Sequence, residues 1–301
     1  MKRILLLLAI VAATLTVEAQ ESFKFGKVTK ADLQKTDYHI AAGADAVVLD
    51  ELQQTYLWRT SQDRNWLFKE NGHISYSHTT ISRKIKILRP EGSRCAKVAI
   101  ECFYADKEKY PAHTVEYISA IEAYSYTLVD GNVVKKRLQD QDVKAKILND
   151  TTALVEFTIP NVQSGSIIEY EYSLLKSSVR NYSIDFDLQR DIPVLSTKCL
   201  VATDKSIPTA TMREDNWYAI TKSGHNHISS QQTDGVYILN PRPASTHIYQ
   251  KYHMQIGMGS IDRIKSNCKM YYFSTENLPA IPANANKENI AAIKVVLLED
   301  K

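Results

Sequence analysis

Glycine is scarce in this chain. Only 10 of its 301 residues are glycine, against 17 tyrosines, so a glycine-rich loop that wraps phosphate groups is not expected. An excess of charge of one sign is also missing, because 37 Lys and Arg stand against 34 Asp and Glu, a formal net charge of +3. So small an excess excludes a nucleic-acid binder driven by bulk positive charge. The hydrophobic fraction of 44% instead indicates an ordinary globular protein.

Long apolar runs are also missing after the first residues. Residues 1–19 have the pattern of a secretory signal peptide: Lys2 and Arg3 come first, and the apolar segment from Ile4 to Leu15 follows. That segment, about twelve residues long, is too short to span a bilayer comfortably. Val17-Glu18-Ala19 fits a small-x-small cleavage site. We therefore expect an exported protein, periplasmic or extracellular, with no transmembrane segment after cleavage.

Cysteine is sparse, with Cys95, Cys102, Cys199 and Cys268 as the complete set. All four lie in contexts that indicate strands. If Cys95 and Cys102 share one continuous strand they point to opposite faces and cannot bridge each other. A bridge from either to Cys199 or Cys268 stays open, as do four buried thiols. None follows a glycine turn or opens a helix, where the helix dipole would lower the thiol pKa. We therefore expect no catalytic cysteine.

Local signals predict a chain made mostly of strands. A short helix is expected around 31–34, because Thr29 can cap it and Asp32 lies three residues on. Ile81, Arg83, Ile85 and Ile87 alternate with Ser82, Lys84, Lys86 and Leu88, as in a half-buried strand. Asp130-Gly131 between two such runs predicts a hairpin. We expect residues 154–159 and 166–174 to form the next strand pair.

The resulting fold class is all-β, a large antiparallel β-sandwich with one or two short helices. Helices long enough to connect parallel strands are not indicated. Residues 20–301 are expected to form this module. A division into two sub-domains, with a seam near 191–208, remains an alternative because Pro193 and Pro208 lie there.

Two groups of residues suggest catalysis, and neither is strong. His225 and His227 would share one strand face, but zinc catalysis needs three protein ligands, and nothing fixes a third among Asp234, His247 and His253. Asp185 and Asp187 would lie about 7 Å apart on a strand, within the range of inverting glycosidases. Exposed hairpin histidines and a solvated strand face are the commoner explanations. We expect no catalytic residue, metal or cofactor in this chain.

Tyrosine-rich strands suggest a binding surface. Tyrosine joins a flat apolar ring to a polar tip, which suits a sugar or a peptide. The same residues are often cross-strand packing partners, so both interpretations stay open. The predicted binding residues are Tyr124, Tyr126, Tyr170 and Tyr172, with Tyr117 as a further member of the same group.

Several segments together resemble one known family. The most specific is Phe157 to Tyr172, a strand, a Pro-Asn turn, a glycine and an Ile-Glu-Tyr strand. Residues 188–194 are similar to the family's Phe-Gln-x-x-x-Pro-Val segment, with Leu188 in place of the usual aromatic residue. Further matches lie at 25–33, 121–131 and 278–280. The chain thus resembles domain of unknown function 3857, the β-rich module that precedes a transglutaminase-like core in many secreted bacterial proteins.

The resemblance implies a function without catalysis in this chain. The transglutaminase-like core, with its Cys-His-Asp triad, is missing before Lys301, so no catalytic residue carries over; a longer native protein would hold the triad beyond that point. We therefore expect a secreted module that binds or positions substrate for a transglutaminase-like or peptidase core in cis or in trans. The ligand would be a peptide, a glycan or peptidoglycan, not nucleic acid. A stand-alone envelope-binding protein and a hydrolase are the alternatives.

Overall fold

The computed structural model describes residues 23, 25–61, 73–103, 114–178, 183–204, 210–213, 229–239, 264–281 and 292–297. These residues form one short α-helix, two short 3-10 helices and fourteen strands. The predicted all-β class is therefore confirmed. The expected signal peptide, His225 and His227 lie outside the described residues.

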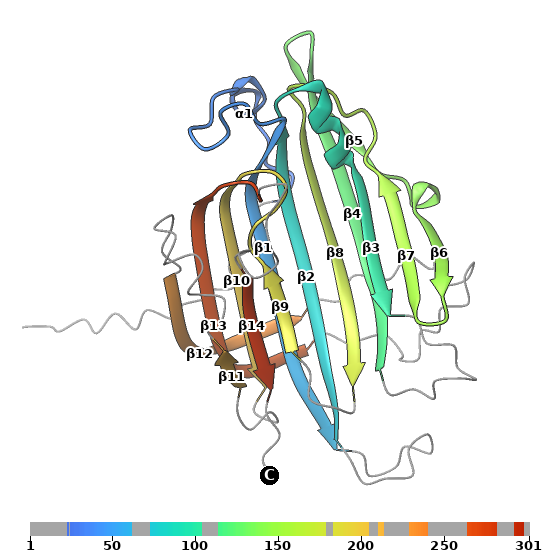
Figure 1. The fold of residues 1–301 in the computed structure, drawn as a ribbon, viewed down its shortest axis with the longest axis vertical. Helices are drawn as coiled ribbons and strands as arrows, with labels where there is room; N and C mark the ends of the chain where they lie inside the picture. The colour runs from blue at the N-terminus through green and yellow to red at the C-terminus, as the bar shows by residue number, and fades with distance from the viewer. Residues whose placement is uncertain are drawn as a thin grey trace, which may run out of the picture.

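The largest element is an eight-stranded sheet in the order β12-β13-β10-β1-β2-β8-β4-β5 (Figure 1). Its strands are β1 (Ala46–Ser61), β2 (His73–Ile87), β4 (Thr114–Val129), β5 (Asn132–Arg137), β8 (Ile167–Ser178), β10 (Val194–Asp204), β12 (Ser229–Leu239) and β13 (Ile264–Leu278).

One pair of neighbours makes this sheet mixed, whereas we expected it to be purely antiparallel. β1 and β10 run parallel, with Val48 opposite Val194 near the start of each strand. A parallel pair needs a long connection between its strands, and here β2 to β9 supply it. A parallel pair so far apart in the chain leaves no local sequence signal.

Two smaller sheets cover one face of the large sheet, which we call the front face. One contains β3 (Lys97–Phe103), β7 (Thr152–Thr158) and β6 (Lys144–Asn149); the other contains β11 (Ala210–Arg213), β14 (Ala292–Leu297) and β9 (Ser183–Asp187). In Figure 1 β3 lies before β4, with β7 and β6 to its right, and β9 and β14 lie before β1 and β10. Residues 154–159 and 166–174 therefore do not pair with each other, contrary to expectation, because β7 and β8 belong to different sheets.

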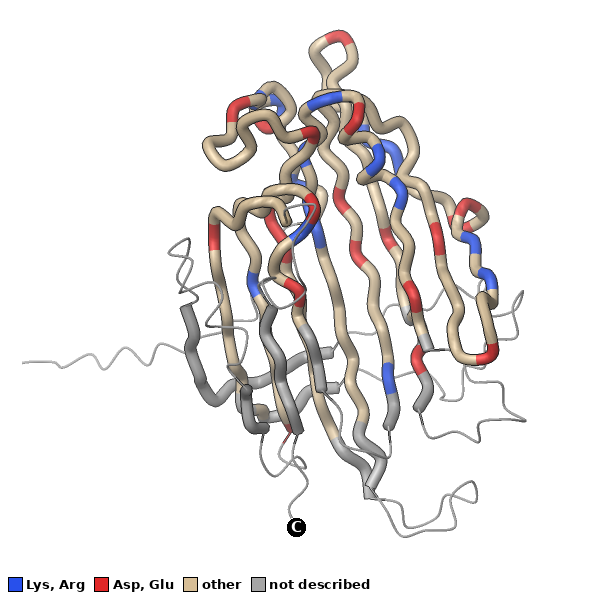
Figure 2. Tube along the Cα trace, viewed as in Figure 1, with Lys and Arg blue, Asp and Glu red and all other residues tan. Residues whose placement is uncertain are grey.

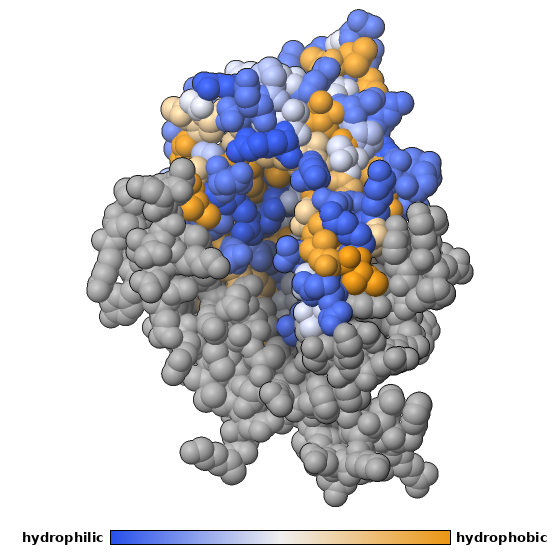
Figure 3. Space-filling model, turned by 45° about the vertical axis from the view of Figure 1, so that its right-hand side comes forward, coloured by the Kyte–Doolittle hydropathy of each residue, from blue (hydrophilic) through white to orange (hydrophobic). Residues whose placement is uncertain are grey.

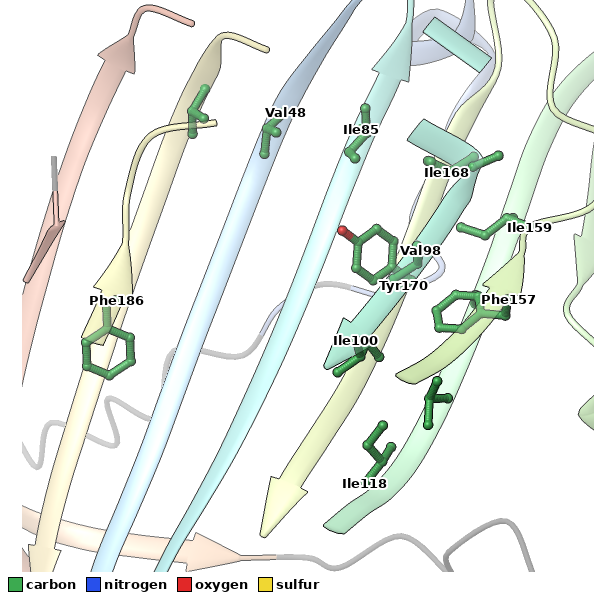
Figure 4. Packing of buried hydrophobic residues seen from close by; sticks show 14 of the residues in the cluster. Val48, Ile85, Val98, Ile100, Ile118, Phe157, Ile159, Ile168, Tyr170 and Phe186 are labelled. Carbon is green, nitrogen blue, oxygen red and sulfur yellow. The ribbon is translucent and has the colours of Figure 1, made fainter. Parts of the chain in front are cut away.

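The main core lies between the large sheet and the two small ones. Ile85 of β2 and Ile168 of β8 meet Val98 and Phe157 of the β3-β7-β6 sheet, and Phe186 of β9 joins the same cluster (Figure 4). Each such side chain contributes roughly 1.5–3 kcal/mol when fully buried. The period of two along β2 and β8 puts these apolar residues on the front face and sends the residues between them to the back face.

Two predictions that depend on only a few consecutive residues, the capped helix and the hairpin, are confirmed. Helix α1 (Lys30–Gln34) begins with a capping box in which the side chains and backbone of Thr29 and Asp32 bond to each other. Asp130 and Gly131 both have positive φ, 49° and 77°, as a two-residue turn between β4 and β5 requires. The predicted hairpin and helix both form.

Two further features bear on domain organisation. β10 pairs with β1 on one side and with β13 on the other, so the hydrogen-bonded ladder is continuous through the first part of the expected 191–208 seam. No helix among the described residues has both the length and the apolar character that a membrane crossing requires.

Candidate functional site

A cleft of about 410 Å³ opens on the front face between the two small sheets. Its floor comes from β1, β2 and β8. One wall is the 3-10 helix η1 (Pro90–Ala96) with the start of β3, and the other is the loop from Leu188 to Pro193 that leads into β10. Figure 3 shows the hollow and the hydrophilic side chains that surround it. The second 3-10 helix, η2 (Asp140–Asp142), does not line it.

A buried glutamate organises the floor of the cleft. Glu51 of β1 has 0% of its surface exposed. The register of β1 and β2 sets Arg83 directly opposite, and its Nε donates to Glu51 Oε2. Arg190 of the loop donates from Nη2 to Glu51 Oε1 at 2.8 Å, and Gln53 Nε2 donates to the same oxygen at 2.6 Å.

The charges around Glu51 fix its ionisation. Burial alone would raise the pKa of this carboxyl, but the positive charges of Arg83 and Arg190 outweigh burial and hold the pKa below its ordinary value. Glu51 is therefore an anion at neutral pH. Because two guanidinium groups face one carboxylate, the net charge of Arg83, Arg190 and Glu51 together is +1.

The rim of the cleft carries two further basic residues, each with acidic partners. Arg94 of η1 lies 3.3 Å from Asp191 and 3.4 Å from Asp45, and Lys97 of β3 lies 3.4 Å from Glu156. Figure 2 shows basic and acidic positions interspersed over the described strands and loops. Four described lining residues are basic and one, Asp191, is acidic; the other acidic partners, Glu51, Asp45 and Glu156, stand behind the lining.

Two tyrosines stand beside the guanidinium groups. Tyr170 is 3% exposed and its hydroxyl accepts a hydrogen bond from Arg83 Nη1 at 2.5 Å. The ring of Tyr172, two residues further on the same face, stacks on Tyr170 with ring centroids 6.5 Å apart and planes 11° apart. Tyr172 is half-buried, and burial raises its pKa to about 12. A flat apolar surface thus adjoins the arginines.

The other two predicted tyrosines lie on the back face. Tyr124 is opposite Glu169 and Tyr126 opposite Ile167 in the register of β4 and β8. The Tyr126 hydroxyl donates to Glu169 Oε2 at 2.9 Å, and Lys135 Nζ lies 3.7 Å from the centre of the Tyr124 ring. The four tyrosines therefore form no single patch. The structure brings Tyr170 and Tyr172 to the cleft and uses Tyr124 and Tyr126 in packing.

The cysteines differ from expectation in one place. Cys95 lies in η1, not in a strand, because Pro90 opens a 3-10 helix there. No disulfide joins the four cysteines. Burial raises the pKa of Cys95 in the cleft wall, raises that of Cys102 to about 11, and raises that of Cys199 well above its ordinary value. These thiols stay protonated and are poor nucleophiles.

The two acidic residues of β9 are the other candidate group. Asp185 and Asp187 are both on β9 as expected; the Asp187 side chain is exposed, and Asp187 is not among the residues that line the cleft. Among the described residues no three His, Cys, Asp or Glu side chains gather as metal ligands would.

Sequence reasoning missed the central residues of the site, although one signal was present. Arg83 occupies the apolar face of its own strand, between Ile81 and Ile85. A charged side chain on an apolar face is rarely buried without a partner. The position of Arg83 therefore indicates a buried ion pair. The identity of the partners, Glu51 and Arg190, depends on strand pairing and was not readable.

Comparison with known proteins gives no family. No family model matches the chain, and no curated protein matches it. A crystal structure from Parabacteroides distasonis, of a protein presumed to be a protease, is 11% identical with a TM-score of 0.47 and covers 84% of this chain. One from Legionella pneumophila, presumed to be a nutrient-binding protein, is 10% identical with a TM-score of 0.29 and covers 83%. This chain spans 40% of the first protein and 67% of the second. Neither likeness is strong enough to support an argument about function.

Proposed function

We propose that this chain is an exported, non-catalytic binding module that holds a peptide or glycan ligand in the front-face cleft. The observation that carries the proposal is the cleft itself, in which two arginines and two stacked tyrosines converge on a rigid sheet. Rigid strands with side chains locked by a buried glutamate are a preorganised binding site.

The chemistry of the lining favours binding over catalysis. A guanidinium group keeps its proton at any ordinary pH, and the raised pKa values of Tyr172 and Cys95 keep these groups protonated as well. Such groups donate hydrogen bonds and offer apolar contact, but they exchange protons poorly near neutral pH. The signal-like residues 1–19 and the resemblance to domain of unknown function 3857 add the setting: a ligand outside the cytoplasm, presented to a transglutaminase-like or peptidase core. A stand-alone envelope-binding protein would use the same cleft.

A matched pair of tyrosine variants tests the proposal. Tyr172 and Tyr124 are both half-buried and lie on neighbouring strands, but on opposite faces of the sheet. We would titrate the processed chain with a panel of peptides and cell-wall glycan fragments by calorimetry. Tyr172→Ala should weaken binding at least about tenfold, the value of an aromatic contact, and Tyr124→Ala should leave it unchanged.

Three results would contradict the proposal. The first is that no member of the panel binds. The second is that both variants weaken binding equally, which would place the effect in folding. The third is that the chain converts the bound ligand and Asp187→Asn abolishes the conversion, which would favour the hydrolase alternative.

A further inference from the structure

Arg83 and Arg190 do not use all of their N–H groups in hydrogen bonds to the described residues. Hydrogen bonds to described residues use two of the five N–H groups of Arg83 and three of the five of Arg190. Both side chains retain some exposure, 16% for Arg83 and 17% for Arg190, although Glu51 beneath them has none. Both arginines line the cleft, and Glu51 lies buried behind them.

From this geometry we infer that the cleft recognises a carboxylate of its ligand, a peptide C-terminus or the carboxylate of an acidic sugar. The inference rests on the proposed function and names the group that is bound. One negative charge balances the single excess positive charge of Arg83, Arg190 and Glu51. A planar carboxylate also matches the fork of a guanidinium group, which can bind both oxygens at once.

The described lining fits a phosphate group less well. Phosphate sites in proteins commonly use backbone N–H groups of glycine-rich loops or helix N-termini, and the described lining contains no glycine. The rim cations Arg94 and Lys97 already have acidic partners, so they reinforce a monoanion more than they balance a dianion. The half-buried Tyr172, stacked on Tyr170, then contacts the apolar part of the ligand next to its carboxylate.

Paired probes that differ only in charge test the inference. We would measure the affinity of N-acetyl-alanyl-alanine against its C-terminal amide, and of glucuronate against glucose, with inorganic phosphate as a competitor. The acid of at least one pair should bind tenfold or more tightly than its neutral counterpart, and its affinity should fall as salt rises. Binding by the peptide acid alone identifies a peptide terminus, and binding by glucuronate alone identifies an acidic sugar.

Two lysines that share a partner provide a matched control. Lys97 and Lys146 both pair with Glu156, at 3.4 and 3.5 Å, and both are exposed, but only Lys97 lines the cleft. Lys97→Met should weaken binding of the acid several-fold, and Lys146→Met should not. Arg190→Lys, which keeps the charge and loses the fork, should weaken it about tenfold or more.

The outcomes separate the inference from the proposed function. Equal affinity for acid and neutral probes, with binding still lost in Tyr172→Ala, overturns carboxylate recognition and leaves the binding module standing. Stronger binding of phosphate than of either acid overturns the inference in favour of a phosphate site. Equal effects of Lys97→Met and Lys146→Met overturn the placement in this cleft. If no probe and no panel ligand binds, both the inference and the proposed function fall.

Discussion

The two faces of the large sheet each bury a glutamate with no exposed surface, Glu51 in front and Glu169 behind. Both interact with a basic residue of β2, Arg83 in front and Lys84 behind, because neighbouring residues of a strand point to opposite faces. What surrounds the two clusters differs. The front cluster borders the cleft, whereas the back cluster is covered by the segment around α1.

The back cluster is covered by the N-terminal segment and by side chains of β2 and β4. Glu169 Oε2 accepts hydrogen bonds from the backbone N–H of Gly26 at 2.8 Å and from Tyr126, and Lys84 Nζ lies 2.8 Å from Oε1. The neighbouring Lys86 Nζ donates to the carbonyl oxygens of Leu33 and Gly165 at 2.6 and 2.8 Å. These bonds attach the N-terminal segment to the sheet.

The two glutamate clusters contain similar residues but differ in what surrounds them, so we expect them to have different roles. In the back cluster Lys84 faces Glu169, and the buried Lys86 beside it donates to backbone carbonyl oxygens. In the front cluster two arginines face one glutamate, and both line the cleft. A closed cluster stabilises the fold or specifies its arrangement, while a cluster that borders a cleft is available to a ligand.

Removing either glutamate charge should have the largest effect on stability. Glu51→Gln and Glu169→Gln each leave a buried cation without its partner, which typically costs about 3–5 kcal/mol of unfolding free energy. Urea denaturation of both variants measures the loss.

The two variants should differ in their response to acetate. Acetate can approach Arg83 and Arg190 from the cleft that they line, so it should restore part of the stability of Glu51→Gln, relative to chloride at equal ionic strength. The covered back cluster should leave Glu169→Gln unaffected. Equal rescue of both variants, or of neither, would remove the distinction between an open and a closed face.

As pH falls, the contribution of His78 on the back face to folding stability should be lost before that of Glu51 on the front face. His78 lies on the back of β2, opposite Tyr56, and burial lowers its pKa from 6.5 to about 4. Between those values the unfolded chain binds more protons than the folded chain, so stability falls as pH falls, by about 3 kcal/mol in total. Glu51, with its lowered pKa, loses its contribution only as pH falls below its ordinary value of 4.5.

Denaturation at pH 7 and pH 5 checks this order. His78→Gln should flatten the change between these two pH values, and His39→Gln, at an exposed position beside α1, should leave it as in the parent chain. A pH dependence that persists in His78→Gln would assign the acid sensitivity to other groups.

The smallest expected effect concerns the segment around α1, which covers the cluster on the back face. Thr29→Ala removes the two hydrogen bonds of the Thr29 hydroxyl, Thr29 Oγ1 to Asp32 Oδ2 at 2.8 Å and Asp32 N to Thr29 Oγ1 at 3.2 Å, and keeps the bond from the residue 29 backbone N–H to Asp32 Oδ2. Loss of such a cap costs about 1 kcal/mol. Faster amide exchange at Asp32 and Leu33, with the exchange of Tyr170 in β8 unchanged, is the expected result. Unchanged exchange at Asp32 would show that Lys86 alone holds the helix in place.

Prediction from sequence succeeded where the determining residues are close in the chain. The Thr29 cap, the Asp130-Gly131 turn and the alternation along β2 each depend on a few consecutive residues, and all three form. The separation of β7 from β8 into two sheets was missed, since a connection of eight residues, 159–166, suits a strand pair and a passage between sheets equally well. The four tyrosines were predicted as one group, but they lie on opposite faces of the sheet, because parity along a strand does not tell which strand face meets which neighbour.

The sequence by itself determined the all-β class, the short capped helix and the apolar face that carries Arg83. Only the tertiary structure decided the candidate site. Glu51 meets Arg83 across 32 residues and Arg190 across 139 residues of chain. The antiparallel register of β1 and β2 makes the first contact, and the parallel placement of β10 beside β1 brings the preceding loop to make the second. Contacts of that separation are set by the burial of whole sheet faces against each other, which no local pattern encodes.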